Sequence, residues 1–236
     1  MWKGKSVSVV FSTYNEKDSV RDYIDDLFKT GVVDEVIAVN NNAVNGTKEE
    51  IDKTGAKQFF ERKQGYGFGY QRALKESTGD IVIMTEPDGT FLAKDIFKFL
   101  TYSENFDVVF GARTVNAAIL NGANMGLFLK YGNVFVAKMI ELLFGTTHLS
   151  DAGCTMKLIK KNALKKISPY FSVGSSHFGL ELNLLVIKNR LKYIEIPIIY
   201  KKRIGESSVT GSFWKAFKLG IVMIWGVIKF RILGKL

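Results

Sequence analysis

The chain of 236 residues has little of what marks secreted proteins. It contains a single cysteine, Cys154, so no internal disulfide can form and a reducing compartment is expected. The N-terminus carries two lysines and then only a short apolar run, which predicts a first strand rather than a signal peptide. Internal repeats and low-complexity segments are absent. The two histidines, His148 and His177, lack metal-ligand spacing, and we interpret both as structural or surface groups.

Acidic residues are scarce in the last third of the chain. Residues 156–236 hold 16 Lys and Arg against 3 Asp and Glu, a net charge of +13, whereas residues 1–155 hold 17 against 20, a net charge of −3. Such a basic segment is typical of proteins that bind nucleic acid, anionic lipid or phosphate-bearing substrates. The terminal residues favour lipid, and we expect no nucleic-acid partner.

The segment 213–230 predicts an amphipathic helix. Its spacing of three and four places six apolar residues on one face (Trp214, Phe217, Ile221, Ile224, Trp225 and Ile228) and lysines 215, 218 and 229 on the opposite stripe. The uncharged run 219–228 would span about 15 Å, roughly half a bilayer core. We therefore predict a domain of residues 1–210 and an interfacial helix, residues 211–236, bound peripherally to an anionic membrane surface. A terminal helix that packs on the core is the alternative.

The first half of the chain alternates strands with helices. We expect strands at residues 6–12, 34–39, 56–61, 80–84 and 107–111, and helices at 18–30, 48–53, 70–77 and 94–103. This alternation predicts an α/β fold, a mainly parallel twisted sheet with helices on both faces. The second half is less regular, with a loop at 114–124, helices at 126–144 and 178–188, and a strand at 193–200 interrupted by Pro197.

The stretch 78–91, TGDIVIMTEPDGTF, carries the clearest chemical signal. Its apolar strand ends in two carboxylates, Glu86 and Asp88, with Pro87 between them and Gly89 after them. Acidic side chains at i and i+2 beyond the end of a strand can share a divalent cation such as Mg²⁺ or Mn²⁺. In open α/β sheets, ligands bind at that edge. The alternative is an acidic surface turn.

Two other segments follow strands. Residues 12–16, STYNE, end the first strand, so their polar side chains should lie at the same edge as the acidic turn, although a plain turn with a helix cap explains them equally. Residues 65–69, GYGFG, lie between a strand and a helix, where a phosphate can bind. They are not the dinucleotide fingerprint, which belongs to the first βα turn.

Basic groups and one acid stand in isolated positions of the second half. Arg113, Lys130 and the run 201–203, KKR, could bind phosphate, although each alone is explained as a solvated cation. Asp151, in LSDAGC, could be a catalytic or orienting carboxylate, or a cap of its turn.

In this order, the segments resemble a family 2 glycosyltransferase of the GT-A fold, of the kind that includes dolichyl-phosphate mannose synthases and undecaprenyl-phosphate glycosyltransferases. The resemblance covers residues 7–209 and rests on VSVVFSTYNE, VDEVIAVNNNAVNGT, the glycine-rich turn with TGD, EPDGTF, FGAR, LKYGN, SDAGCTMK and YKKRIGESS.

The resemblance implies roles for particular residues. Donor binding falls to Ser12, Tyr14, Glu16, Asn40, Asn41, Gly65, Gly67 and Glu86; Mg²⁺ or Mn²⁺ binding to Glu86 and Asp88; and the catalytic or acceptor-binding roles to Asp88, Arg113, Lys130, Asp151 and Arg203. Arg113, Lys130 and Arg203 are expected on the acceptor side of the cleft, opposite Asn41. The implied reaction is inverting transfer of a sugar from a UDP- or GDP-sugar to a polyprenyl phosphate, at the cytoplasmic face of a membrane.

The chain departs from the family pattern in two places. Asn40 and Asn41 replace a usual pair of aspartates, which leaves the nucleobase open, and Glu86 replaces the first aspartate of the metal motif. Two other readings stay open: a transferase with a carbohydrate hydroxyl acceptor, and a nucleotide-sugar-binding subunit without turnover, which only the asparagines support. A homo-oligomer or a membrane-protein partner is also left open.

Overall fold

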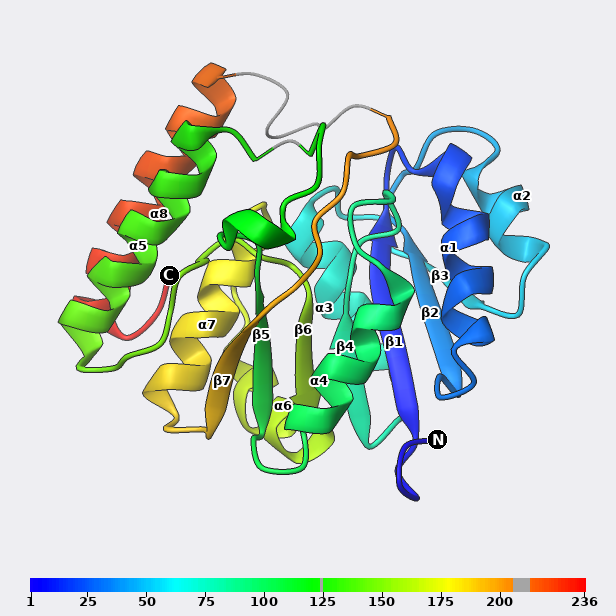
Figure 1. The fold of residues 1–236 in the computed structure, drawn as a ribbon, viewed down its shortest axis with the longest axis horizontal. Helices are drawn as coiled ribbons and strands as arrows, with labels where there is room; N and C mark the ends of the chain where they lie inside the picture. The colour runs from blue at the N-terminus through cyan, green and yellow to red at the C-terminus, as the bar shows by residue number, and fades with distance from the viewer. Residues whose placement is uncertain (124, 206–212) are drawn as a thin grey trace.

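One sheet organises the molecule, which is a computed structural model that describes residues 1–123, 125–205 and 213–236. Its seven strands lie in the order β3-β2-β1-β4-β6-β5-β7 (Figure 1). β6 is antiparallel to both of its neighbours, and the other pairs are parallel, which confirms the mainly parallel sheet. The strands are Val7–Thr13 (β1), Glu35–Asn40 (β2), Lys57–Phe60 (β3), Ile81–Met84 (β4), Val108–Ala112 (β5), Lys157–Lys160 (β6) and Tyr193–Pro197 (β7).

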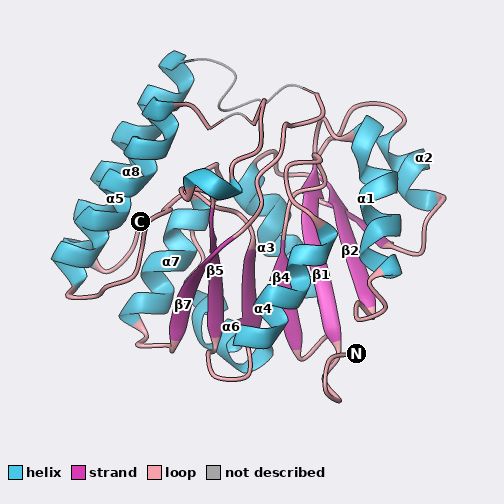
Figure 2. Cartoon of the chain, in the orientation of Figure 1, coloured by secondary structure: helices cyan, strands magenta, loops and turns pink. Residues whose placement is uncertain are grey.

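Helices cover both faces of this sheet (Figure 2). α1 and α4 lie on one face, and α3, α6 and α7 on the other, while α5 and α8 form a separate pair at one side (Figure 1). The helices are Lys17–Lys29 (α1), Thr47–Asp52 (α2), Tyr66–Glu76 (α3), Ile96–Tyr102 (α4), Leu127–Phe144 (α5), Lys161–Ile167 (α6), Phe178–Lys188 (α7) and Phe213–Leu233 (α8), with short 3₁₀ turns at Ala93–Asp95, Asn116–Ala118 and Ser168–Tyr170.

The apolar pattern of the strands places the sheet in the core. β1 and β4 have almost no exposed residue, as expected of strands covered on both faces. Because β1 and β4 pair in parallel, with Val10 opposite Met84, the polar residues that follow each strand meet at one edge of the sheet. β6 runs the other way, so the turn that precedes it, residues 151–155, also arrives at this edge.

The glycine-rich segment begins a helix rather than preceding one. We predicted a helix at 70–77, but α3 starts at Tyr66, so Gly67 and Gly69 lie in its first turn. A methyl group on Gly67 would lie 2.1 Å from the Val173 carbonyl oxygen, and one on Gly69 would lie 2.1 Å from Ser12 Oγ. These glycines therefore allow the helix to pack against its neighbours at backbone distance, which local sequence pattern does not reveal.

Other elements depart from the predicted pattern in the second half. β6 and α6 were not predicted, and the strand expected at 193–200 ends at Pro197, which lacks the N–H needed to continue the ladder. The described part of the 114–124 loop contains a 3₁₀ turn, Asn116–Ala118. The predicted domain boundary at 210/211 lies outside the described residues.

α8 is apolar on two sides rather than one. Ala216, Met223, Val227 and Phe230 are buried against the domain, whereas Trp214 and Trp225 of the predicted apolar face are 68% and 65% exposed. α8 runs beside α5 in the same direction, since Phe128 packs near Phe217 and Phe144 near Phe230. Within the described residues, no helix has both the length and the apolar character needed to cross a bilayer.

Gly67→Ala should destabilise the fold. The new methyl group meets a backbone carbonyl that cannot move alone, and such overpacking costs about 1–3 kcal/mol. Chemical denaturation should show this loss in the free energy of unfolding. The matched control is Gly132→Ala in α5, where a methyl group meets nothing within 4 Å. Because alanine favours the helix more than glycine does, this change should raise the free energy of unfolding by about 0.5–1 kcal/mol. Equal stability of the two variants would contradict the packing argument.

Candidate active site

Three carboxylates and one guanidinium meet at the carboxyl edge of the sheet. Arg203 places Nη1 2.6 Å from Asp88 Oδ2 and Nη2 2.6 Å from Glu16 Oε1. Glu86 Oε2 lies 3.9 Å from Nη1 of the same arginine. We refer to Glu16, Glu86 and Asp88 as the acid cluster. The cluster joins the two segments, 12–16 and 86–89, that the sequence placed at one edge.

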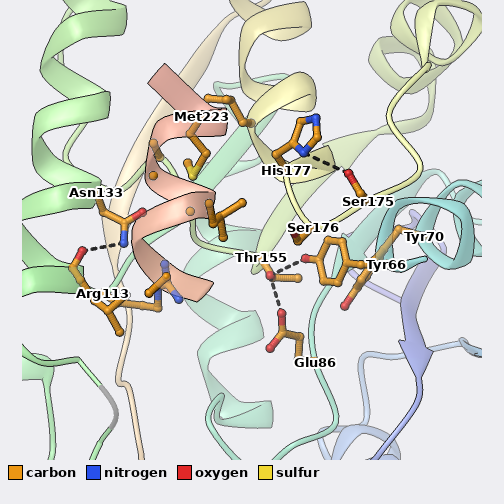
Figure 3. A pocket seen from close by; sticks show the side chains of 18 of the residues that line it. Tyr66, Tyr70, Glu86, Arg113, Asn133, Thr155, Ser175, Ser176, His177 and Met223 are labelled. Atoms are coloured by element: carbon orange, nitrogen blue, oxygen red, sulfur yellow. Dashed lines mark hydrogen bonds between the residues drawn. The ribbon is translucent and has the colours of Figure 1, made fainter. Parts of the chain in front are cut away.

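In each carboxylate of the acid cluster, the oxygen that points away from Arg203 accepts a hydrogen bond from another group. Asp88 Oδ1 accepts hydrogen bonds from the N–H and the hydroxyl of Thr90, and Glu16 Oε2 accepts from the N–H groups of Tyr14 and Asn15. Glu86 Oε1 accepts from the Thr155 hydroxyl, which also contacts Tyr66 Oη (Figure 3). The remaining oxygens, Asp88 Oδ2, Glu16 Oε1 and Glu86 Oε2, therefore face the same positive group.

Burial and neighbouring charges shift the pKa values of the acid cluster and of Arg203. Desolvation, with the charge of Asp88 adding to it, raises the pKa of Glu86 to about 7, and burial also raises the pKa of Glu16. Burial alone would lower the pKa of Arg203, but the nearby carboxylates, Asp88 first, raise it. The arginine thus stays charged, and it offsets part of the cost of burying several carboxylates together.

The position of Arg203 corrects our expectation. We expected it on the acceptor side, away from the donor motifs, but its guanidinium lies on the metal motif itself. The chain reaches this place because, after β7, it crosses back over the sheet edge. There Lys201 N–H donates to the Thr90 carbonyl and Ile204 N–H donates to the Asp88 carbonyl.

A second ion pair joins Arg113 to Asp151. Arg113 Nε and Nη2 lie 2.8 and 2.9 Å from the two oxygens of Asp151, and the Arg113 backbone N–H donates to the same carboxylate at 2.9 Å. Asp151 is 1% exposed. Burial would raise the pKa of Asp151, but Arg113 overrides this and holds it below its usual value. A carboxylate so fully engaged orients Arg113 and is a poor proton acceptor.

Sequence reasoning missed Glu195, which fixes Asp151 from behind. Its carboxylate accepts hydrogen bonds from the N–H and hydroxyl of Ser150 and from the N–H of Asp151. The available signal was an acid inside the apolar strand β7, YIEIP, because a half-buried strand holds an acid only where it has partners. Glu195, Asp151 and Arg113 thus form a chain of contacts that ends at the cleft.

The predicted donor residues fall into two groups. Ser12, Tyr14, Glu16, Gly65 and Glu86 line the cavity beside the acid cluster, together with Arg113 and Arg203. Asn40, Asn41 and Gly67 do not line it.

Asn41 is engaged on all sides. Its amide donates to the carbonyls of Glu61 and Lys63, and its carbonyl oxygen accepts from the N–H of Gly65. The side-chain oxygen Oδ1 of Asn40 accepts a hydrogen bond from the Ala43 N–H. Asn41 therefore shapes the loop before α3, and its own polar atoms are already used.

Lys130 does not join the other basic groups. It is on α5, where its Nζ donates to Asn116 Oδ1, and it is not part of the cavity wall. Asn133, one turn further along the same helix, lines the cavity instead (Figure 3). His177, which we interpreted as a structural or surface group, is half-buried and also lies in the wall, with Nδ1 hydrogen-bonded to Ser175 Oγ.

The cavity itself has two chemically different ends. Its volume is about 510 Å³. At the sheet edge the wall is polar and carries Glu16 and Glu86 of the acid cluster together with both arginines. Away from the edge the wall is formed between α5 and α8 and is largely apolar, with Phe128, Leu129, Gly132 and Val136 from α5 and Ala216, Leu219, Gly220 and Met223 from α8.

The sheet order, the crossing chain and the charged cleft at the carboxyl edge are those of a GT-A fold. Residues 8–168 match the family model described as glycosyl transferase family 2. The match covers more than half of the chain, so the protein belongs to glycosyl transferase family 2 and is a glycosyltransferase.

Relatives and solved structures are consistent with this assignment. The chain is 28% identical over 207 residues to dolichyl-phosphate hexose transferase of Haloferax volcanii, covering 86% of each chain. It is 23% identical to dolichyl-phosphate beta-glucosyltransferase of Saccharomyces cerevisiae, covering 85% of this chain and 68% of that one. Glucosyl-3-phosphoglycerate synthase from Mycobacterium tuberculosis, solved with Mn²⁺, UDP and glucosyl-3-phosphoglycerate, superposes with a TM-score of 0.73 at 14% identity, covering 99% of this chain and 81% of that one. The last likeness concerns the fold.

Glu195→Gln should loosen the Asp151 turn. The amide group of glutamine places a donor where Ser150 and Asp151 both present donors, and a lost charge-assisted hydrogen bond costs about 1.5–3 kcal/mol. The free energy of unfolding should fall by that amount and sugar transfer should slow. Glu49→Gln, at an exposed position of α2, should change stability by less than about 0.5 kcal/mol. A Glu195→Gln variant as stable as the Glu49→Gln control would refute the role of Glu195.

Proposed function

We propose that this enzyme transfers a sugar from a nucleoside diphosphate to a polyprenyl phosphate at a membrane surface. The observation that carries the proposal is the cavity, which joins a charged end at the sheet edge to an apolar end between α5 and α8. A polyprenyl phosphate has the same two parts, a dianionic head and a long apolar chain. The names of the Haloferax and yeast relatives, both of which refer to dolichyl phosphate, support the same acceptor class.

The donor should bind at the polar end. Ser12, Tyr14 and Gly65 line that part of the cavity and would contact the nucleotide, with Asn40 and Asn41 shaping the loop beside it.

Glu86 and Asp88 suit Mg²⁺ or Mn²⁺, because each turns one hard oxygen ligand toward the same point. The described residues contain no complete cage of three or more acid, cysteine or histidine ligands, and such ions commonly take their other ligands from substrate phosphates and water. A bound cation would neutralise the charge that develops on the leaving diphosphate.

The acceptor phosphate should need little help to attack. The second pKa of a phosphomonoester is about 6, so the group is largely dianionic at neutral pH. One of its oxygens forms the bond to C1 of the sugar as the bond from C1 to the diphosphate breaks, and attack from the opposite side inverts C1. Arg113, oriented by Asp151, would position this phosphate in the cleft. Lys130 lies outside the wall and would act from the rim.

Filling the apolar end should separate lipid from carbohydrate acceptors. A Cβ atom added at Gly220 would meet nothing within 4 Å, and Gly220 lies in the cavity wall, so the leucine of Gly220→Leu should reach into the space proposed for the lipid. Displacing two or three methylene groups, at about 0.8 kcal/mol each, should raise the KM for a long polyprenyl phosphate about tenfold or more. Donor affinity, measured by calorimetry, should stay unchanged.

The matched control for this experiment is Gly126→Leu. Gly126 is exposed at the start of α5, its Cβ position is open, and it lies outside the cavity wall. Its KM should match that of the unmodified enzyme. If Gly220→Leu also has an unchanged KM, or if only carbohydrate hydroxyls accept the sugar, the lipid-phosphate acceptor is rejected.

The outer faces of α5 and α8 fit a lipid surface. Among the described side chains of these helices, nine large apolar or aromatic ones are more than half exposed: Leu127, Tyr131, Phe135 and Leu142 on α5, and Trp214, Ile221, Trp225, Ile232 and Leu233 on α8. Exposed apolar residues in such numbers mark an interaction site. Basic residues of the same helices, including Lys138, Lys218 and Arg231, give the surface the charge that anionic headgroups attract. We therefore extend the interfacial element from α8 to the α5/α8 pair.

Trp225→Ser and Leu142→Ser should each weaken binding to liposomes that contain anionic lipid. Each removes an apolar side chain worth about 2 kcal/mol on insertion, so affinity in a sedimentation assay should fall about tenfold or more. Added salt should weaken binding further. Tyr170→Ser, which removes a 61% exposed side chain elsewhere, is the control and should bind as the unmodified protein does. Failure of the unmodified protein to bind at low salt would exclude this surface.

A further inference from the structure

The acid cluster already holds a positive charge that comes from the chain. Arg203 contacts Asp88 Oδ2 and Glu16 Oε1 at 2.6 Å and faces Glu86 Oε2 at 3.9 Å. The other oxygen of Asp88 is engaged by Thr90. A divalent cation held by Glu86 and Asp88 would need the very oxygens that face the guanidinium. The cation and Arg203 therefore cannot both occupy this position.

We propose that Arg203 is an internal counter-ion, which occupies the cation site of the free enzyme and leaves it when a divalent cation arrives with the nucleoside diphosphate. The identity of that cation and of the diphosphate rests on the proposed function. The competition itself rests on the contacts of Arg203 alone.

Electrostatics gives a reason for this arrangement. Asp88 is 1% exposed and Glu16 8% exposed, and Glu86 faces the same point. Carboxylates that lie this close together in a poorly solvated site repel each other unless a cation lies between them. Arg203 supplies that cation before the donor binds, so the three side chains of the acid cluster stay together in the free enzyme.

The local contacts allow the side chain to leave without its backbone. The segment around Arg203 is fixed by main-chain hydrogen bonds from Lys201 to Thr90 and from Ile204 to Asp88, neither of which involves the guanidinium. Nε of Arg203 is buried and has no hydrogen-bond partner among the described residues. Arg203 also lines the cavity, so rotation about its side-chain bonds would carry the guanidinium toward a phosphate bound there.

A thermodynamic consequence follows from this exchange. A divalent cation that binds without a nucleotide must break the two short contacts of Arg203 with Asp88 and Glu16. It brings no anion to which the displaced guanidinium could bind. A cation that arrives with a diphosphate brings an anion that the freed arginine can bind. Cation and nucleotide should therefore bind with positive coupling, and part of that coupling should depend on Arg203.

The test is Mn²⁺ binding by Arg203→Met, followed by the loss of the free-ion signal in electron paramagnetic resonance with no lipid or sugar present. Methionine keeps an unbranched apolar stem and removes the competing charge. Affinity for bare Mn²⁺ should rise by about ten- to a hundredfold, the equivalent of one or two charge-assisted contacts. UDP or GDP, whichever binds, should increase Mn²⁺ affinity less in this variant than in the unmodified enzyme.

Two controls define the result. Lys202→Met removes the same charge from the exposed neighbouring position and should leave Mn²⁺ affinity unchanged, which separates local competition from net charge. Asp88→Asn should bind Mn²⁺ weakly in either background. If Arg203→Met binds bare Mn²⁺ no more tightly than the unmodified enzyme, the proposal is overturned. If Arg203→Met does not fold without cation, Arg203→Lys, which cannot bridge two carboxylates as a fork does, should bind Mn²⁺ several-fold more tightly, and equal affinity would overturn the proposal.

This outcome is independent of the acceptor. Tighter Mn²⁺ binding by Arg203→Met with no transfer to polyprenyl phosphate would leave the inference intact and reject the proposed function. Unchanged Mn²⁺ binding with normal transfer would do the reverse.

Discussion

The balance of buried charge at the carboxyl edge of the sheet constrains the rest of this structure. Four acids that are central to the cleft, Glu16, Glu86, Asp88 and Asp151, are held there with two arginines. The two arginines are held very differently. Arg113 is matched by one carboxylate in a two-bond contact that a third residue supports, whereas Arg203 is shared among three carboxylates and retains an unpartnered Nε among the described residues. The contacts of Arg113 with Asp151 should therefore persist when substrates bind, whereas a divalent cation can replace Arg203 in the acid cluster.

The second constraint is the apolar packing of the helices α5 and α8. α5 and α8 pack on each other and on the domain through Val136, Ala137, Val227 and Phe230, so they are part of the core on one side. On the other side they leave large side chains exposed, and between them runs the apolar end of the cavity. A substrate with a charged head and an apolar tail would place the head at the sheet edge and the tail between these two helices.

The sequence revealed the sheet edge well and the second half of the fold less well. The alternation of apolar strands and amphipathic helices was sufficient to predict β1 to β5, and four of these strands, β1, β2, β4 and β5, are buried on both faces. β6, KLIK, was missed because lysines at both ends suggest a solvated segment, yet Lys157 is 1% exposed and its amine donates to the Cys154 carbonyl. The position of Arg203 could not be predicted either. It depends on where the chain goes after β7, and no local pattern encodes that path.

The parallel course of α5 and α8 has a consequence for the electric field of the molecule. Their axial dipoles point the same way, and both N-terminal ends lie toward the edge where β1 and β4 end (Figure 1). Aligned neighbours repel each other slightly, and the packing between them must offset that repulsion. In return, their partial positive charges add at one end, each stabilising a nearby anion by about 0.3–1 kcal/mol. The paired helices thus give the molecule a polarity along their axes, with the end that attracts anions on the same side of the molecule as the carboxyl edge of the sheet (Figure 1).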